Sequence, residues 1–312
     1  MKKLATLLMA GILSVGLIGC GTSSDNESGS TQPSSEEVQT SSKEAETSSK
    51  DTEPSSEDAE ASNEDAESTI VITGSTSVEK ILNDMKEEFM ALNPGVNIEY
   101  VGSGSSAGIA DTKAGTNNIG TLSREIKDEE KEDALKSEVF AYDGIAMIVN
   151  PSNTAVEDLS TEQLVKIYSG EITNWSEVGG EDAEIFVVSR EESSGTRSAF
   201  EELIGLQDAG GLTEKAAVSE GNGPVQAAVA GNENAIGYVS FSFIDDTVKA
   251  VKVDGVEGNA ELAKEGTYPL SRPFIFCYYD DKVTELGKEF IEFALSEDGQ
   301  VSVEDHGGIP IN

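Results

Sequence analysis

The sequence predicts an α/β fold of two lobes. Between residues 69 and 136, three short apolar runs typical of strands are each followed by a turn and then by a helical pattern. Repeated strand and helix units favour a parallel sheet with ligand-facing loops at the carboxyl ends of its strands. Roughly 244 residues follow position 68, and a chain of that length usually exceeds a single hydrophobic core. We therefore expect two lobes.

The first half of this region carries the clearest alternation. Residues 69–73 form an apolar strand pattern that ends at Gly74, and apolar side chains then recur at helical spacing from Val78 until Pro94 stops them. The next predicted elements are a strand at 96–101, a helix at 107–114, a strand at 119–122 and a polar helix at 128–136. Each of the first two strands leads into a turn rich in serine and glycine.

A longer apolar run follows at residues 140–149, interrupted by Asp143 and Gly144. This run exceeds an average strand, so it could pass from one lobe into the other. The remaining predicted elements are helices at 161–168, 224–230 and 283–295 and strands at 185–188, 235–239, 248–253 and 274–279.

Three turns rich in serine and glycine, at residues 74–77, 102–106 and 188–197, each join a strand pattern to a helix pattern. In the third turn, Ser193 or Ser194 can cap the following helix, and Gly195 allows a ligand to approach the backbone. The unpaired N–H groups at a helix start bind anions, and Arg190 adds a fixed positive charge. One such turn is more often an ordinary helix cap with a surface arginine. Three of them favour a single anion pocket.

The chain begins with an export signal. Two lysines precede the apolar residues 4–17, a run too short to span a bilayer, and the sequence Leu-Ile-Gly-Cys at residues 17–20 follows. These four residues resemble a lipobox, in which Cys20 becomes the acylated first residue of the mature protein. Residues 1–20 are therefore expected to be a lipoprotein signal peptide, and acyl chains such as palmitate would anchor the protein to the extracytoplasmic face of the cell membrane.

Residues 21–68 are expected to be a disordered acidic tether. This segment has almost no bulky apolar side chain, so it cannot bury enough surface to fold. Residues 22–68 hold fourteen acidic side chains against Lys43 and Lys50, a net charge of −12. A self-repelling tether is the interpretation that we favour, and an acidic segment that binds a partner is the alternative.

The net charge of the whole chain is −38 at pH 7, and about −28 of it belongs to residues 69–312. A nucleic-acid role is excluded, because a phosphate backbone would be repelled rather than neutralised. An anion site remains possible if its donors are local, because distant acids are screened over about 8 Å. Cys277 lies in an apolar run and is expected to be a buried small hydrophobe.

Several longer motifs, in this order along the chain, resemble the PstS family, the phosphate-binding lipoproteins of bacterial phosphate ABC importers. They occur at residues 104–108, 167–175, 189–196 and 235–238, and the similarity covers roughly residues 69–312. The resemblance implies a two-lobed periplasmic-binding-protein fold of type II, with the ligand cleft between the lobes. It implies a first lobe of about residues 69–144 and 240–312 and a second lobe of about residues 145–239.

The resemblance also implies a set of phosphate ligands, carried over position by position. The residues carried over are Ser75, Thr76, Ser77, Ser105, Arg190, Ser194, Gly195 and Thr196. Ser123, Arg124 and Asp143 are further expected phosphate-binding residues, which the family pattern itself does not supply. Glu192 stands where the family often has an acid that orients the arginine. No metal and no cofactor is expected. The implied partners are inorganic phosphate, ABC permease subunits and, through the lipid, the membrane, and the chain is expected to be a monomer.

One position departs from the family pattern. The strand end after Gly120 often carries an aspartate that accepts the proton of hydrogen phosphate, but this chain has Ser123 and Arg124 there. A hydroxyl accepts a hydrogen bond without adding charge, and Asp143 could supply the missing carboxylate. The alternative for Asp143 is a turn residue before Gly144. Arg124 either adds positive charge to the pocket or pairs with an acid outside it.

Three rival functions are weighed against phosphate capture. A serine hydrolase usually needs an oriented base, but the only histidine, His306, lies in a different context near the C-terminus. The chain is therefore not expected to be an enzyme. A binder of another tetrahedral oxyanion, sulfate or molybdate, stays open as the alternative because of the missing aspartate. The third rival is an adhesin or structural lipoprotein whose tether is the active part.

Overall fold

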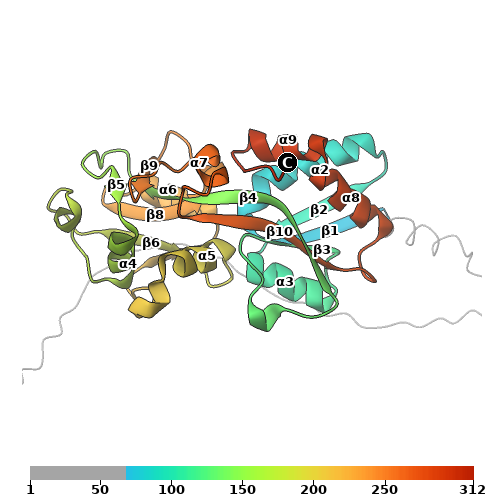
Figure 1. Ribbon diagram of the computed structural model, residues 1–312, viewed down its shortest axis with the longest axis horizontal. Helices are drawn as coiled ribbons and strands as arrows, with labels where there is room; N and C mark the ends of the chain where they lie inside the picture. The colour runs from blue at the N-terminus through green and yellow to red at the C-terminus, as the bar shows by residue number, and fades with distance from the viewer. Residues whose placement is uncertain (1–67) are drawn as a thin grey trace, which may run out of the picture. The chain divides into compact units, whose positions relative to one another are not determined.

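The structure is a computed structural model, and it describes residues 68–312. The predicted leader, the lipobox with Cys20 and nearly all of the acidic tether lie outside the described residues. The described chain contains a ten-stranded mixed sheet with the principal strand order β2-β1-β3-β10-β4-β8-β6-β7. Helices lie on both faces of this sheet (Figure 1).

The first three strands confirm the predicted strand and helix alternation. Strands β1 (Thr69–Gly74), β2 (Asn97–Gly102) and β3 (Ile119–Leu122) are parallel, with β1 in the middle. Helices α2 (Glu79–Leu92) and α3 (Ser105–Ala114) occupy the two connections between them. Helix α3 begins two residues earlier than predicted. A short 3₁₀ turn, η1 (Thr76–Val78), precedes α2.

The predicted polar helix at 128–136 is wrong. Only a 3₁₀ turn, η2 (Asp128–Glu130), forms there, and strand β4 (Leu135–Val149) already begins at Leu135. The reason is tertiary: Leu135 and Val139 pack beside a small buried cluster that contains Ile275 and Cys277 of β10 (Ser271–Tyr279). Antiparallel pairing with β10 therefore outweighs the local helical pattern.

Strand β4 runs from one half of the sheet into the other, as its length predicted. Residues 135–144 pair with β10, whereas residues 145–149 pair with β8 (Ala235–Ser240) and β9 (Lys249–Val253). All three partner strands are antiparallel to β4. The sheet is therefore mixed, whereas the sequence predicted a parallel sheet. The change of partner falls directly after Asp143 and Gly144. Figure 1 shows β4 and β10 side by side across the middle of the described chain.

The second half of the sheet is built around β8. Strand β6 (Phe186–Arg190) is parallel to β8 and to the short edge strand β7 (Ala217–Ser219), while β5 (Asp158–Leu159) pairs with β9. The accompanying helices are α4 (Thr161–Ser169), α5 (Gly195–Ile204), α6 (Asn222–Ala230) and α7 (Ala260–Lys264), with the 3₁₀ turns η3 (Trp175–Val178), η4 (Leu206–Ala209) and η5 (Phe241–Phe243). Strands β5 and β7 and helix α7 were not predicted.

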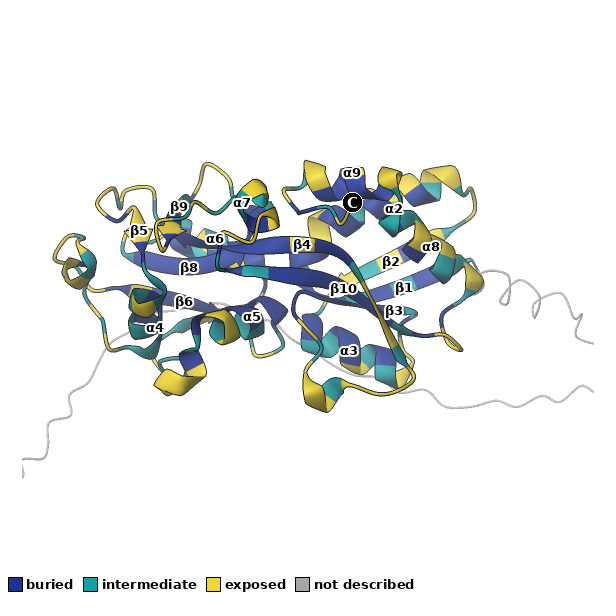
Figure 2. Cartoon of the chain, viewed as in Figure 1, coloured by how far each residue is buried: buried dark blue, intermediate teal, exposed yellow. Residues whose placement is uncertain are grey.

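Two large clusters of buried apolar side chains form the core. One joins β1, α2, the first part of β4, β10 and α8 (Glu285–Leu295), through residues such as Ile72, Phe89 and Phe290. The other joins the last part of β4 to β6, β8 and α4, and it also contains Val251, Tyr268 and Leu270. Figure 2 shows that the central strands are buried along both halves. Two separate cores are what a two-lobed fold requires.

The chain ends with two helices against the first core. Helix α8 was predicted, but α9 (Glu297–Asp305) was not, because its polar sequence lacks a clear apolar stripe. His306 follows α9, and its Nε2 lies 3.6 Å from Asp84 Oδ2.

Cys277 is fully buried, and burial raises the pKa of its thiol to about 11. Within residues 68–312, no helix has the length and apolar character that a membrane span needs.

Candidate anion-binding site

The first serine turn lies directly after β1. Gly74 adopts φ +139, and a Cβ there would stand 2.2 Å from Thr121 O, so only glycine lets β1 turn this close to β3. Ser75 N–H donates to Thr121 O at 2.9 Å, and Ser75 Oγ accepts from Ser77 N–H at 3.1 Å. These contacts fix the turn. Ser77 is fully buried.

The second turn and the end of β3 lie next to each other. Ser105 is the first residue of α3, and its Oγ accepts from Ser123 N–H at 3.1 Å. The two hydroxyls, Ser105 Oγ and Ser123 Oγ, are 3.3 Å apart. Both side chains are fully buried. The structure therefore brings Ser105 and Ser123 together, although 18 positions separate them.

The third turn joins β6 to α5 and meets both of the others. Ser194 caps α5, since its Oγ accepts from Arg197 N–H at 3.2 Å. A Cβ at Gly195 would lie 2.0 Å from Ser105 Oγ and 2.6 Å from Ser123 Oγ, so the start of α5 can approach these hydroxyls only because residue 195 is glycine. Thr196 Oγ1 is 2.8 Å from Ser77 Oγ. All three turns thus converge, as predicted.

Arg190 lies at the end of β6 and is only 1% exposed. Its Nε and Nη2 donate to the two carboxylate oxygens of Glu191 at 2.9 and 2.7 Å, and Nη2 also donates to Thr76 Oγ1 at 3.0 Å. Nη1 is buried and has no hydrogen-bond partner among the described residues. An unpaired guanidinium nitrogen inside a protein is costly, so this donor points to a ligand.

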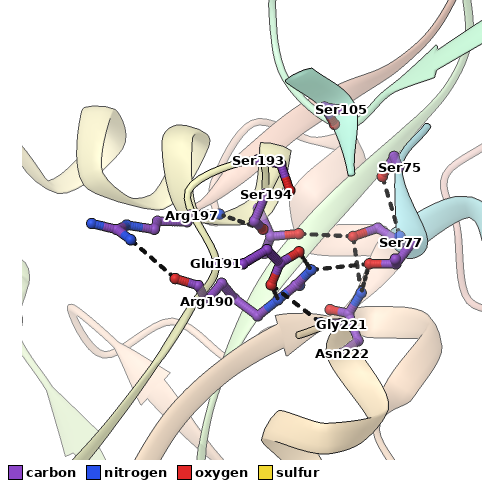
Figure 3. A network of polar contacts seen from close by, with 12 residues as sticks. Ser75, Ser77, Ser105, Arg190, Glu191, Ser193, Ser194, Arg197, Gly221 and Asn222 are labelled. Atoms are coloured by element: carbon purple, nitrogen blue, oxygen red, sulfur yellow. Dashed lines mark hydrogen bonds and ion pairs between the residues drawn. The ribbon is translucent and has the colours of Figure 1, made fainter. Parts of the chain in front are cut away.

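Two further polar side chains complete the site, and the sequence analysis missed both. Asn222, the first residue of α6, donates from Nδ2 to Thr76 Oγ1 at 3.3 Å and to Ser77 Oγ at 3.2 Å. The available signal was the Gly-Asn-Gly sequence at the start of α6, a fourth glycine-containing turn that leads into a helix. Figure 3 shows the Asn222 side chain directed toward Ser77, with the Arg190 guanidinium nearby.

Arg272 was the second omission. It lies on β10 and is 3% exposed, and its Nη2 and Nε donate to Asp143 Oδ2 at 2.8 and 3.1 Å. The same guanidinium donates to Ser77 Oγ at 3.1 Å and to Ser123 O at 3.2 Å. One charged residue within the otherwise apolar strand 271–279 was the signal that could have revealed it.

The resulting chemistry is that of an anion receptor. Buried hydroxyls, the Arg190 guanidinium and the N–H groups at the start of α5 gather where the three turns meet (Figure 3). The buried Arg272 guanidinium reaches the same place through its bond to Ser77 Oγ. Each arginine is partly neutralised by one carboxylate, Glu191 or Asp143. Among the described residues, no group of His, Cys, Asp and Glu side chains could hold a metal ion. Donors concentrated at helix starts favour a small oxyanion.

Comparisons with known proteins agree with this chemistry. The PBP superfamily domain model matches residues 38–298. The phosphate-binding protein PstS of Bacillus subtilis is 36% identical over 251 residues, which cover 78% of this chain and 81% of that protein. The chain belongs to the PstS family. Its fold is the two-lobed α/β fold of the periplasmic-binding-protein superfamily.

Solved structures of PstS-like proteins give the same result. The crystal structure of a substrate-binding protein from Clostridium perfringens with bound phosphate is 48% identical, with a TM-score of 0.76, and the match covers 78% of this chain and all of that one. An ABC-type phosphate transport receptor from Vibrio cholerae is 37% identical, with a TM-score of 0.66 and coverage of 77% and 99%.

The acid that orients Arg190 differs from the expected one. Glu192, which occupies the position where the PstS family often has this acid, is exposed. Glu191 instead holds Arg190 through two hydrogen bonds and also accepts from Gly221 N–H at 3.2 Å. Burial opposes ionisation of Glu191, but the bonds from Arg190 outweigh it and hold the pKa of Glu191 below its ordinary value. Glu191, and not Glu192, therefore orients Arg190 in this structure.

Asp143 does not fit the role of proton acceptor. Its Oδ2 accepts twice from Arg272, and its Oδ1 accepts from Ser240 Oγ at 3.0 Å and from Phe241 N–H at 3.3 Å. A carboxylate offers about four lone pairs, so none remains for a ligand proton. Burial raises the pKa of Asp143, and the contact with Arg272 opposes that rise. We therefore interpret Asp143 as the partner of Arg272.

Arg124 pairs with the acid Glu130, and its Nε is buried with no hydrogen-bond partner among the described residues. Its guanidinium makes two hydrogen bonds of 2.7 Å to Glu130 and one of 3.1 Å to Ser106 Oγ, and no contact to Ser77, Thr196 or Arg190 is seen. Burial disfavours the charged form of Glu130, but hydrogen bonds from Arg124 and Lys127 N–H outweigh it, so the pKa of Glu130 lies below its ordinary value.

The Glu130 carboxylate should stabilise the fold in a pH-dependent way. Because its folded-state pKa is lowered, its contribution is present above the unfolded glutamate pKa of about 4.3 and is lost as the pH falls through the folded value. We expect Glu130→Gln to lower the free energy of unfolding by about 1 to 3 kcal/mol near neutral pH. Urea unfolding of both proteins should give converging stabilities in acid.

The matched control is Glu129→Gln, because Glu129 is exposed on the same turn. We expect that variant to unfold like the unmodified protein at both pH values. A Glu130→Gln deficit of equal size in acid would contradict an ionised Glu130 as the source of the stability.

Proposed function

We propose that this protein is an extracytoplasmic binding protein that captures inorganic phosphate and delivers it to an ABC importer. The observation that carries the proposal is the buried Nη1 of Arg190, an unpaired charged donor where three serine turns meet. Relatives named for phosphate binding support the same ligand. Sulfate or molybdate is the weaker alternative, because no relative or solved structure reported above is named for either.

Phosphate would be held without a metal. The ligand groups are the buried Arg190 guanidinium, the hydroxyls of the three turns and the N–H groups at the start of α5. The proposed phosphate-binding residues are Ser75, Thr76, Ser77, Ser105, Ser123, Arg190, Ser194, Gly195 and Thr196, with Asn222 and Arg272 added from the geometry. Arg124 and Asp143 are not counted as ligands in this proposal. Each forms an ion pair with another residue, Arg124 with Glu130 and Asp143 with Arg272.

The two lobes would close on the ligand. The first lobe supplies Ser77, Ser105 and Ser123, and the second supplies Arg190 and Thr196. The membership of the buried clusters supports a second lobe of about residues 145–270, because Val251, Tyr268 and Leu270 pack with its core. The first lobe would then contain about residues 69–144 and 271–312. The chain would re-enter the first lobe at about residue 271, whereas the sequence suggested residue 240.

Binding, and not catalysis, is the role that we assign to these serines. His306 lies just after α9 and contacts Asp84 of α2. In the described chain, no serine of the three turns hydrogen-bonds to a histidine. Without an oriented base, a serine hydroxyl is a weak nucleophile at neutral pH. Delivery to a permease and action as a monomer are parts of the same proposal.

The decisive experiment is titration calorimetry of the full chain with phosphate. Charge-assisted hydrogen bonds contribute about 1.5 to 3 kcal/mol each, so Arg190→Ala should weaken phosphate binding at least tenfold. The control is Lys166→Ala, which removes one positive charge from α4 that pairs with exposed Glu162. That variant should keep the original affinity. Equal affinity of Arg190→Ala would remove Arg190 from the site.

Selectivity should depend on Ser123. Phosphate near neutral pH carries a proton that sulfate lacks, and Ser123 Oγ can accept it. We expect Ser123→Ala to lower phosphate affinity by about 1 to 3 kcal/mol and to change sulfate affinity much less. Parallel titrations with both anions measure this difference. An equal loss for the two anions would place the proton acceptor elsewhere.

Anchoring through Cys20 is the remaining part of the proposal, and it concerns residues outside the described chain. One lipobox cysteine modified with several acyl chains gives stable membrane attachment, because each buried CH₂ contributes about 0.8 kcal/mol. Cys20→Ala should therefore move the protein from the membrane fraction to the soluble fraction, with phosphate affinity unchanged. Continued membrane association of the variant would argue for another anchor.

A further inference from the structure

The end of β6 that carries Arg190 is weakly held by the sheet. Strand β6 pairs with the central strand β8 only at its first two residues, Phe186 and Val187. From Val188 to Arg190 its ladder partner is β7, a three-residue edge strand whose middle residue, Val218, is 58% exposed. Backbone hydrogen bonds near solvent open more easily than buried ones. The position of Arg190 therefore needs support from outside this short ladder.

Two buried tyrosine hydroxyls contact the same stretch of β6. Tyr238 of β8 is 1% exposed, and its Oη lies 2.8 Å from Ser189 Oγ. Tyr168 of α4 is fully buried, and its Oη makes a longer contact of 3.5 Å with Val188 O. The Tyr238 contact is the stronger one, because hydrogen bonds between hydroxyls are best at about 2.8 Å. Its partner Ser189 directly precedes Arg190 in the chain.

The ring of Tyr238 also contacts α5, the helix whose first N–H groups lie at the anion site. It stacks on Phe200 of α5, with the ring centroids 4.3 Å apart and the planes inclined by 22°. Tyr168 packs against both rings, with centroid distances of 4.8 Å to Phe200 and 5.6 Å to Tyr238. Tyr238 therefore links the residue before Arg190 to the helix that follows the third turn.

The hydroxyl of Tyr238 is neutral near neutral pH. Burial raises the pKa of Tyr238 to about 12, although the bond with Ser189 and the charge of Arg190 oppose this rise. A buried hydroxyl needs a partner, because an unpaired one loses its bonds to water without replacement. Ser189 Oγ supplies that partner. Separating Tyr238 from Ser189 would thus leave two polar groups unpaired, and this cost keeps them together.

We propose that Tyr238 is a positioning residue for anion binding, which acts through Ser189 on Arg190. The Arg190 guanidinium keeps Nε and Nη2 on Glu191, while Nη1 stays unpaired for the ligand. Arg197 Nη1 donates to Arg190 O at 3.1 Å, so α5 holds the carbonyl side of Arg190. Tyr238 holds the preceding residue. Binding groups lose affinity when they depart by about 0.5 Å from their best position, so both supports are needed.

The inference rests on the proposed phosphate function and adds a residue that lies outside the proposed ligand set. It also gives a role to two of the family motifs, because residues 167–175 supply Tyr168 and residues 235–238 supply Tyr238. Neither motif contributes a proposed ligand. Their aromatic rings instead pack against Phe200 and one another. Ligand groups that are held in place before binding lose less freedom when the anion arrives, which strengthens binding.

The main variant is Tyr238→Phe, which keeps the ring on Phe200 and removes only the hydroxyl. A neutral hydrogen bond corresponds to a factor of about two to ten, so calorimetry of the full chain should show phosphate binding weakened by about that factor. Ser189→Ala should weaken phosphate binding at least as much, because the Tyr238 hydroxyl then stays buried without its partner. The double variant should bind no more weakly than Ser189→Ala, since both changes remove one contact.

Whether Tyr238 acts through Arg190 is tested in an Arg190→Ala chain, whose affinity is already lowered. There Tyr238→Phe should cause no further loss of phosphate affinity, whereas a general loosening of the fold would lower affinity in both chains. The matched control is Tyr279→Phe at the last residue of β10, which removes a hydroxyl 2.6 Å from Glu132 Oε2. That variant should lose stability in urea unfolding but keep the original phosphate affinity.

The possible outcomes separate this inference from the proposed function. Unchanged affinity of Tyr238→Phe, in a chain that binds phosphate, would overturn the inference alone. An equal loss with and without Arg190 would also overturn it, because Tyr238 would then serve only general packing. If the unmodified chain binds no phosphate, the proposed function fails and the inference fails with it. A loss that appears only when Arg190 is present, with Tyr279→Phe unchanged, would support the inference.

Discussion

The ion pair between Arg272 and Asp143 is the contact on which the rest of the site depends. Both side chains are almost completely buried, and they lie on β10 and β4, the two long strands that join the halves of the sheet. Removing one partner of such a pair usually costs about 3 to 5 kcal/mol, because the other charge stays unpaired. The pair therefore binds the central strands together, and it also extends a guanidinium to Ser77 and Ser123.

The backbone around this pair explains why the turns can converge. Strand β4 exchanges β10 for β8 and β9 directly after Asp143 and Gly144, and a Cβ at Gly144 would stand 2.0 Å from the ring of Phe241. Phe241 N–H in turn donates to Asp143 Oδ1. Glycine at this position thus lets the start of η5 close over the ion pair. The residues at which β4 passes between the two halves of the sheet therefore also hold Arg272 at the anion site.

Local patterns predicted much of this arrangement. Gly74, Gly195 and the serines beside them were recognised because turns after strands and before helices have a distinct composition. The sequence analysis named Glu192 in place of Glu191, although Glu191 is adjacent to the arginine that it holds. Arg272 and Asn222 were not recognised, because their contacts with Ser77 span 195 and 145 positions of the chain. The helix predicted at 128–136 failed for the same reason, since pairing with β10 determines the conformation there. Sequence periodicity contains no information about such distant partners.

The charge of the protein limits how the site can operate. About −28 of the net charge belongs to residues 69–312, so the field of the whole domain opposes the approach of an anion. Screening over about 8 Å confines that field in physiological salt, and each buried arginine already has a carboxylate partner. A ligand at the three turns is therefore held by directed N–H and O–H donors and not by an excess of positive charge. Directed donors distinguish protonation states of an oxyanion, which an unstructured positive field cannot do.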